Sequence, residues 1–134
     1  MVAAMARILV ADDDRAVGEF VRRALVHHGH QVTLVEDGLA ALHALETQDP
    51  FELLLTDIVM PGMDGIALAL KVARDRPELK VLLMSGYAAE RQRAHNLDVL
   101  IQRVISKPFT LQELVRVVDE SLATAKTEDA PRRH

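Results

Sequence analysis

The chain has 134 residues, of which 49% are hydrophobic and 27% charged, and its formal net charge is −4. This size and composition are typical of one soluble globular domain with its own core. The acidic balance disfavours nucleic-acid binding, which needs clustered lysine and arginine, and no apolar run approaches the roughly 18–20 residues of a membrane span. The chain has no cysteine, so disulfides and thiolate metal sites are excluded. The start lacks the regions of a secretory signal, and we expect a cytoplasmic protein.

The first half of the chain predicts two strand–helix units, because short apolar runs alternate with longer amphipathic ones. Asp14 can cap the first helix, since its carboxylate accepts N–H groups of the first turn, and Gly29 can end that helix. The apolar face of this helix carries Val17, Phe20, Val21, Ala24 and Leu25. The predicted elements are a strand at 7–10, a helix at 15–28, a strand at 31–35 and a helix carrying Leu39, Leu42 and Leu45.

The second half predicts three more units and a polar tail. In order, these are a strand at 53–56, a helix at 66–76, a strand at 81–84, a weak polar helix at 88–97, a strand at 103–106 and a helix starting near Leu111. Five such units predict an α/β fold: a doubly wound five-stranded parallel sheet of (βα)5 flavodoxin-like type, with strand order 2-1-3-4-5. We expect one domain over residues 7–123, a polar C-terminal tail over 124–134, and no output domain.

Three predicted strands end in acidic or basic residues. The first runs into Asp12 and Asp13, the third into Asp57, and the fifth into Lys107. Chemistry in an open parallel sheet gathers outside the carboxyl ends of the strands, so these side chains should meet in one crevice. Taken singly, each could be a helix cap, a turn aspartate or a solvated loop lysine. Three converging carboxylates repel one another, however, so a cationic partner is required, and the composition indicates a site for a divalent metal and a phosphoryl group.

Four motifs in order resemble the receiver domain of two-component response regulators, the CheY-like family. They are Asp12-Asp13, the stretch Asp57-Ile58-Val59-Met60-Pro61-Gly62-Met63-Asp64-Gly65, then Ser85-Gly86, and Lys107-Pro108-Phe109. The resemblance spans roughly residues 7–123. The stretches 53–61, 86–88 and 91–98 also look like the CpdR group of alphaproteobacterial single-domain receivers, which act as adaptors in regulated proteolysis and the cell cycle.

The resemblance implies a role for each site residue. Asp57 would accept a phosphoryl group from the phosphohistidine of a kinase or histidine phosphotransfer protein, as a carboxylate nucleophile. Asp13 and Asp57 would bind Mg²⁺ directly, Asp12 more through water, and the Val59 carbonyl would complete the protein ligands. Lys107 would contact the phosphoryl group through its charge, and Ser85 would contact it through its hydroxyl. The chain would therefore be a signalling protein, not an enzyme acting on other substrates.

The sequence departs from the family pattern at the aromatic switch. Receivers often carry an aromatic residue three positions before the lysine, and here that position is Val104. Tyr87 either replaces the switch or packs over the site. Val59 and Tyr87 also occupy positions that gate water at the acyl phosphate, and an apolar and a bulky residue there predict slow self-dephosphorylation.

The expected output is protein binding that depends on phosphorylation, to an unidentified target that could belong to a protease system. The family's output face maps here to Arg93, Asn96, Leu97, Val104, Gln112 and Arg116, and the donor would dock near Arg15, Gly18, Arg22 and Pro108-Phe109. We expect a monomer or weak homodimer that binds neither nucleic acid nor membrane. One alternative is a phosphate shuttle or sink between histidine-containing proteins. Another is a dehalogenase-type phosphohydrolase, disfavoured because its nucleophile would lie on the first strand.

The histidines near Gly29 suggest a second metal site. We interpret His27, His28 and His30 instead as residues at a helix end, where histidine favours the negative end of the helix dipole. Asp64, before the third helix, is interpreted as a helix cap.

Overall fold

The computed structural model describes residues 5–48, 50–86 and 103–123. It contains a five-stranded, fully parallel sheet with strand order β2-β1-β3-β4-β5, as predicted. The strands are β1 (Arg7–Ala11), β2 (Gln31–Val35), β3 (Leu53–Asp57), β4 (Lys80–Ser85) and β5 (Arg103–Ser106). The switch point of this order lies between β1 and β3, which pair directly, so the residues that follow these two strands share one crevice.

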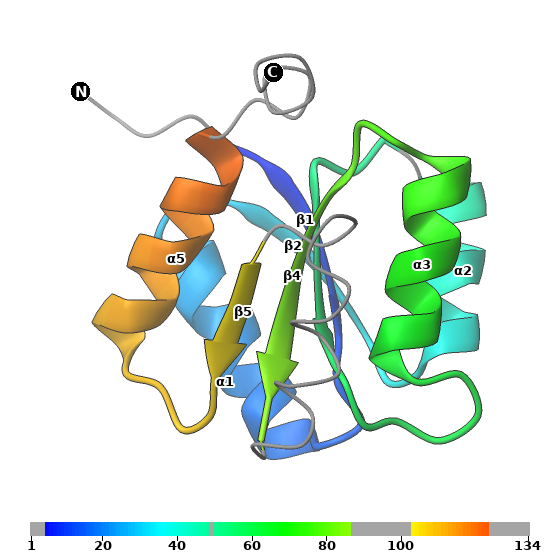
Figure 1. Cartoon of the computed structure of the whole chain (residues 1–134). Helices are drawn as coiled ribbons and strands as arrows, with labels where there is room; N and C mark the ends of the chain where they lie inside the picture. The colour runs from blue at the N-terminus through cyan, green and yellow to red at the C-terminus, as the bar shows by residue number, and fades with distance from the viewer. Residues whose placement is uncertain (1–4, 49, 87–102, 124–134) are drawn as a thin grey trace, which may run out of the picture.

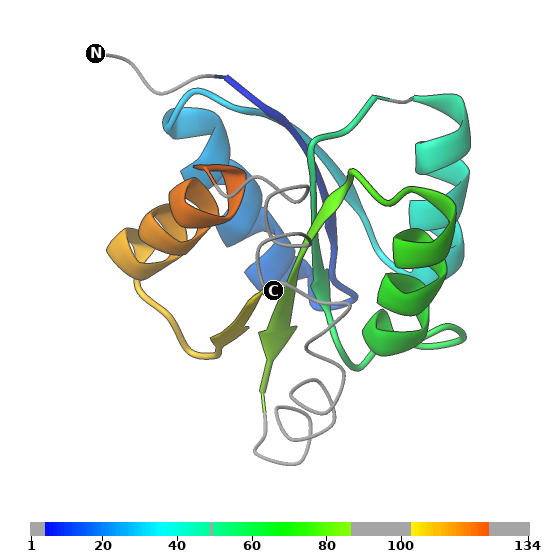
Figure 2. The same cartoon turned by 45° about the horizontal axis from the view of Figure 1, so that its top comes forward.

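Four helices cover the sheet within the described ranges. They are α1 (Arg15–His27), α2 (Gly38–Thr47), α3 (Gly65–Asp75) and α5 (Leu111–Ala123). Figures 1 and 2 show α1 and α5 on one face of the sheet and α2 and α3 on the other. The expected helix at 88–97 lies outside the described residues. None of the described helices has the length and apolar character of a bilayer-spanning segment.

Side chains that cap the first turn determine where the helices begin. Asp14 accepts hydrogen bonds from the N–H groups of Ala16 and Val17, and Asp64 accepts one from Ala67, so both predicted caps are confirmed. At the start of α5, Thr110 and Glu113 exchange two hydrogen bonds, each side chain accepting from the other's backbone N–H. This reciprocal capping box was readable from the Thr-x-x-Glu spacing but was not predicted.

Two apolar cores hold the three layers together. Alternate residues of the buried strands point to opposite faces, so Leu54 packs toward α2 and α3, whereas Leu53 and Leu55 pack toward α1 and α5. β3 is buried along its whole length, which explains its continuous apolar run. The central strands are thereby fixed, and the polar residues at their carboxyl ends are held by a rigid frame.

Two expectations about α1 need refinement. The helix ends one residue early, at His27, and Gly29 takes a positive φ of 102° just beyond it, as predicted for a glycine stop. Phe20 was placed on the buried face but is 42% exposed, and its ring lies 6.3 Å from that of Phe109 between centroids.

Candidate functional site: an acidic crevice at the carboxyl end of the sheet

The three predicted aspartates meet at the carboxyl ends of β1 and β3. Carboxylate oxygens of Asp12, Asp13 and Asp57 lie within 4.8 Å of one another. Asp12 and Asp57 are buried, with 1% and 7% exposure, whereas Asp13 is exposed. The crevice thus has two carboxylates in its floor and one at its mouth.

Lys107 spans the two buried carboxylates. Its Nζ lies 3.0 Å from Asp57 Oδ1 and 3.3 Å from Asp12 Oδ2. The other oxygen of Asp12 accepts a hydrogen bond from the backbone N–H of Asp14, which fixes the carboxylate at the entry to α1. The lysine is distant in sequence from both aspartates, and its backbone N–H donates to the Ser85 carbonyl at 2.7 Å, which ties the end of β5 to that of β4.

The electrostatics of the crevice follow from burial and from like charges. Burial raises the pKa of Asp57 to about 6, and the negative charge of Asp12 adds to this rise, while the hydrogen bond from Lys107 opposes it. Burial also raises the pKa of Asp12. Burial alone would lower the pKa of Lys107, but hydrogen bonding to Asp57 and the charge of Asp12 raise it, so the lysine is firmly protonated.

The remaining predicted site residues fall into three groups. Ser85 is buried at the end of β4, and Val59 is 54% exposed, two residues beyond Asp57. Val104 is half-buried and packs against the α2–α3 core. Tyr87 lies outside the described residues, as do Arg93, Asn96 and Leu97.

Gly65 is a site-supporting residue that sequence reasoning treated only as part of a turn. A Cβ atom at this position would lie 2.0 Å from the carbonyl oxygen of Asp57, so only glycine allows α3 to begin so close to the end of β3. Its N–H donates to the Ile58 carbonyl at 2.7 Å. The spacing between Asp57 and a glycine at a helix start was the only sequence signal for this close approach.

The donor set suits Mg²⁺. All three side chains offer carboxylate oxygens, the ligands this hard cation prefers, and Lys107 alone among the described residues neutralises the two buried ones. The raised pKa of Asp57 shows that its negative charge is incompletely compensated in the protein alone. A divalent cation would complete the compensation.

A doubly wound sheet with a buried aspartate on β3, two acidic residues after β1 and a lysine after β5 is the arrangement expected of a receiver domain. The chain belongs to the response regulator receiver domain family, whose model matches residues 8–119. It is a receiver domain of a response regulator in two-component signalling. Such domains generally bind Mg²⁺ at this acidic cluster.

Individual relatives refine this placement. The chain is 40% identical to the response regulator receiver protein CpdR of Brucella abortus over 121 residues, covering 90% of this chain and all of CpdR. It is 36% identical to the response regulator MprA of Mycobacterium bovis over 92% of this chain but only 54% of MprA. The structure of response regulator TrrA of Thermotoga maritima, a complex with Mg²⁺-BeF, matches with a TM-score of 0.78 and 27% identity, covering 87% of this chain and 98% of TrrA.

Proposed function

We propose that the chain is a phosphorylation-switched, cytoplasmic signalling protein that accepts a phosphoryl group on Asp57 and thereby changes which protein it binds. The observation that carries the proposal is the position of Asp57, buried at the end of β3 and held 3.0 Å from Lys107. The proposed domain spans residues 7–123. The donor is a histidine kinase or a histidine phosphotransfer protein, as receiver-domain membership implies.

The proposed transfer uses the carboxylate of Asp57 as nucleophile. One of its oxygens forms a bond to phosphorus while the phosphorus–nitrogen bond to the donor histidine breaks, and the imidazole leaves with the electron pair and takes up a proton. An ionised carboxylate is required, so a pKa near 6 leaves Asp57 mostly reactive at neutral pH. Gly65 and the buried β3 strand keep the nucleophile in one position, which is the main contribution a protein makes to phosphoryl transfer.

The surrounding residues neutralise the transferred charge. Lys107 already contacts the nucleophilic carboxylate and can pair with a phosphoryl oxygen, and the Ser85 hydroxyl can donate a hydrogen bond to another. Asp12, Asp13, Asp57 and the Val59 carbonyl would hold Mg²⁺. When bound, the ion supplies positive charge that offsets the phosphoryl oxygens. The Mg²⁺-BeF complex of TrrA, a relative of the same fold, supports this assignment.

The proposed output is an adaptor role in which partner binding differs between the phosphorylated and unphosphorylated states. Support comes from the 40% identity to CpdR along the full length of that protein. The exposed Val59 beside the acceptor supports a long-lived phosphoryl group, because an apolar side chain there gives an attacking water no hydrogen-bonding partner. Affinity capture with the phosphorylated protein and with an unphosphorylatable variant, followed by mass spectrometry, would identify state-specific partners.

The phosphoacceptor is tested by incubation with acetyl phosphate or phosphoramidate and Mg²⁺, followed by intact mass measurement. Wild type should gain one phosphoryl group, and Asp57→Asn should gain none. Asp64→Asn is the matched control: it removes a carboxylate from the same loop but keeps a cap of equal quality, so phosphorylation should persist. Magnesium-independent labelling, or labelling that survives in Asp57→Asn, would contradict the proposal.

A further inference from the structure

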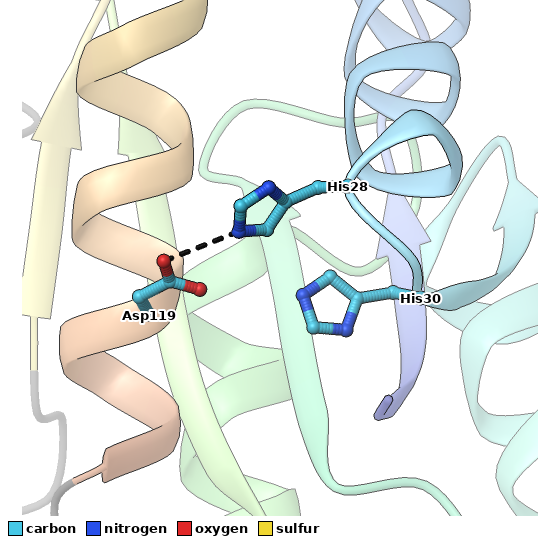
Figure 3. A group of neighbouring side chains, drawn as sticks. All are labelled: His28, His30 and Asp119. Carbon is cyan, nitrogen blue, oxygen red and sulfur yellow. Dashed lines mark hydrogen bonds and ion pairs between the residues drawn. The ribbon is translucent and has the colours of Figure 1, made fainter. Parts of the chain in front are cut away.

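A second cluster of metal-binding side chains lies where the α1–β2 turn meets α5. His28, His30 and Asp119 each offer a ligand atom, and these atoms lie within 4.8 Å of one another. Figure 3 shows both rings reaching from the turn toward the Asp119 carboxylate on α5. His28 Nε2 already lies 3.2 Å from Asp119 Oδ2, and the two imidazole rings are 5.6 Å apart between centroids.

His30 supplies a second, independent observation that points to a ligand at this cluster. The side chain is buried, with 4% exposure, and its Nε2 has no hydrogen-bond partner among the residues that the structure describes. In Figure 3 this nitrogen faces Asp119. Buried polar atoms are nearly always paired, so an unpartnered ring nitrogen aimed at a carboxylate needs an explanation. The interpretation of His30 as a helix-dipole residue was therefore incomplete, because its ring is buried beside β1.

We propose that His28, His30 and Asp119 bind a borderline transition-metal ion, for which Zn²⁺ is the best-matched case, separately from the acidic crevice. Two imidazoles and one carboxylate form a three-ligand set of the kind that leaves a fourth position to water. The set differs in kind from the oxygen-only crevice, because imidazole favours zinc whereas Mg²⁺ favours oxygen. A single domain would thus hold two chemically distinct cation sites.

The geometry allows the ligands to close on an ion. His28 and Asp119 have side chains 33% and 44% exposed, so both can rotate, and they line a groove of about 520 Å³ that provides an entry path. Donor atoms around a tetrahedral zinc ion lie roughly 3.4 Å apart, given bonds of about 2.0–2.1 Å. The His28–Asp119 pair already meets this spacing, so His30 is the ligand that has to move toward the ion.

Zinc binding has one necessary structural consequence. The backbone N–H of Ala6 donates to His30 Nδ1 at 3.1 Å, which keeps the ring proton on Nε2 in the metal-free protein. When Nε2 binds zinc, the proton must reside on Nδ1, so the hydrogen bond from Ala6 breaks. The Ala6 amide, just before β1, is therefore a reporter for occupation of this particular site.

The test is zinc titration of tag-free protein by calorimetry and native mass spectrometry. Asp13→Asn serves as the background, because it weakens the acidic crevice as a competing zinc site. We expect one zinc ion per chain, with affinity reduced about tenfold or more in Asp119→Asn and in His28→Ala. His43→Ala removes an exposed histidine elsewhere and should leave the affinity unchanged.

Nuclear magnetic resonance supplies the second readout. The Ala6 amide signal should shift on zinc addition and lose protection from exchange, and His28→Ala should abolish both effects. His28→Ala and Asp119→Asn both alter partly exposed side chains, so the folded state is retained and the test stays interpretable. Failure to bind zinc at micromolar concentrations, equal affinity in every variant, or an unmoved Ala6 signal in zinc-loaded protein would each overturn the proposal.

Discussion

Asp57→Asn should stabilise the metal-free protein at neutral pH while abolishing its proposed function. The carboxylate has its pKa raised from 3.8 to about 6, so the folded state binds its proton more tightly than the unfolded state does. Ionising Asp57 therefore opposes folding, and wild type loses stability as the pH rises from about 4 to about 6. Asparagine has nearly the shape of the protonated acid and removes this loss.

The size of the effect follows from the shift. A rise of about 2 pKa units corresponds to about 3 kcal/mol at pH 7.5, about 1.5 kcal/mol at pH 5 and almost nothing below pH 3. The side chain is only 10% exposed, so solvent screening reduces this figure little. For a domain of this size, about 3 kcal/mol raises Tm by roughly 10 °C.

The assay is urea unfolding of Asp57→Asn beside wild type at pH 4, 5 and 7.5, first with EDTA and then with Mg²⁺. In EDTA, the difference in free energy of unfolding between Asp57→Asn and wild type should grow as the pH rises. It should narrow in Mg²⁺, because an ion that binds the folded state stabilises wild type, which has the complete carboxylate set. A gap of the same size at pH 4 and pH 7.5 would refute the reasoning, since it could not arise from ionisation of Asp57.

Three further predictions concern the same crevice and its frame. Gly65→Ala should destabilise the fold by about 2–4 kcal/mol and slow phosphorylation, because its Cβ would collide with the Asp57 carbonyl. Thermal melts and labelling assays measure both effects. Gly18→Ala is the control, because its new Cβ meets only the flexible Leu34 side chain. Asp14→Ala should lower the free energy of unfolding by about 1 kcal/mol through loss of the α1 cap, and unchanged labelling with acetyl phosphate would separate this cap from the site. Lys107→Met should lower Tm above pH 6 in EDTA, with Mg²⁺ restoring more stability than in wild type; a variant insensitive to Mg²⁺ would contradict the assigned role.

The strand order and the convergence of the aspartates were predictable because they depend on local pattern and on a topological rule. Buried parallel strands have continuous apolar runs, and the residues just after them have little choice of position. What the sequence did not reveal is how burial divides the acidic pair: Asp12 is 1% exposed, whereas Asp13 faces solvent. The buried Asp12 is paired with Lys107, which lies 95 residues away along the chain, and local pattern does not encode such a contact.

The histidine cluster was missed for the same physical reason. Local spacing placed His28 and His30 at the end of a helix, which is correct, but gave no sign that Asp119 on α5 would lie beside them, 91 residues from His28. Packing of α1 against α5 creates this contact, and no periodicity encodes it. Close approaches such as that of Gly65 to Asp57 are hidden similarly, because a glycine in a turn motif has several possible reasons to be there.

The charge of the crevice explains why the proposed site combines a lysine with a divalent cation. With its three carboxylates ionised and Lys107 protonated, the cluster carries a net charge of −2, which one Mg²⁺ would neutralise. A phosphoryl group on Asp57 would replace one carboxylate charge with about −1.5 to −2 on the phosphoryl oxygens. Lys107 would then be drawn from Asp12 and Asp57 toward that group. Because the lysine is tied through its backbone to the end of β4, such a movement would act on the junction of β4 and β5, and this is how a local charge change could reach a binding surface.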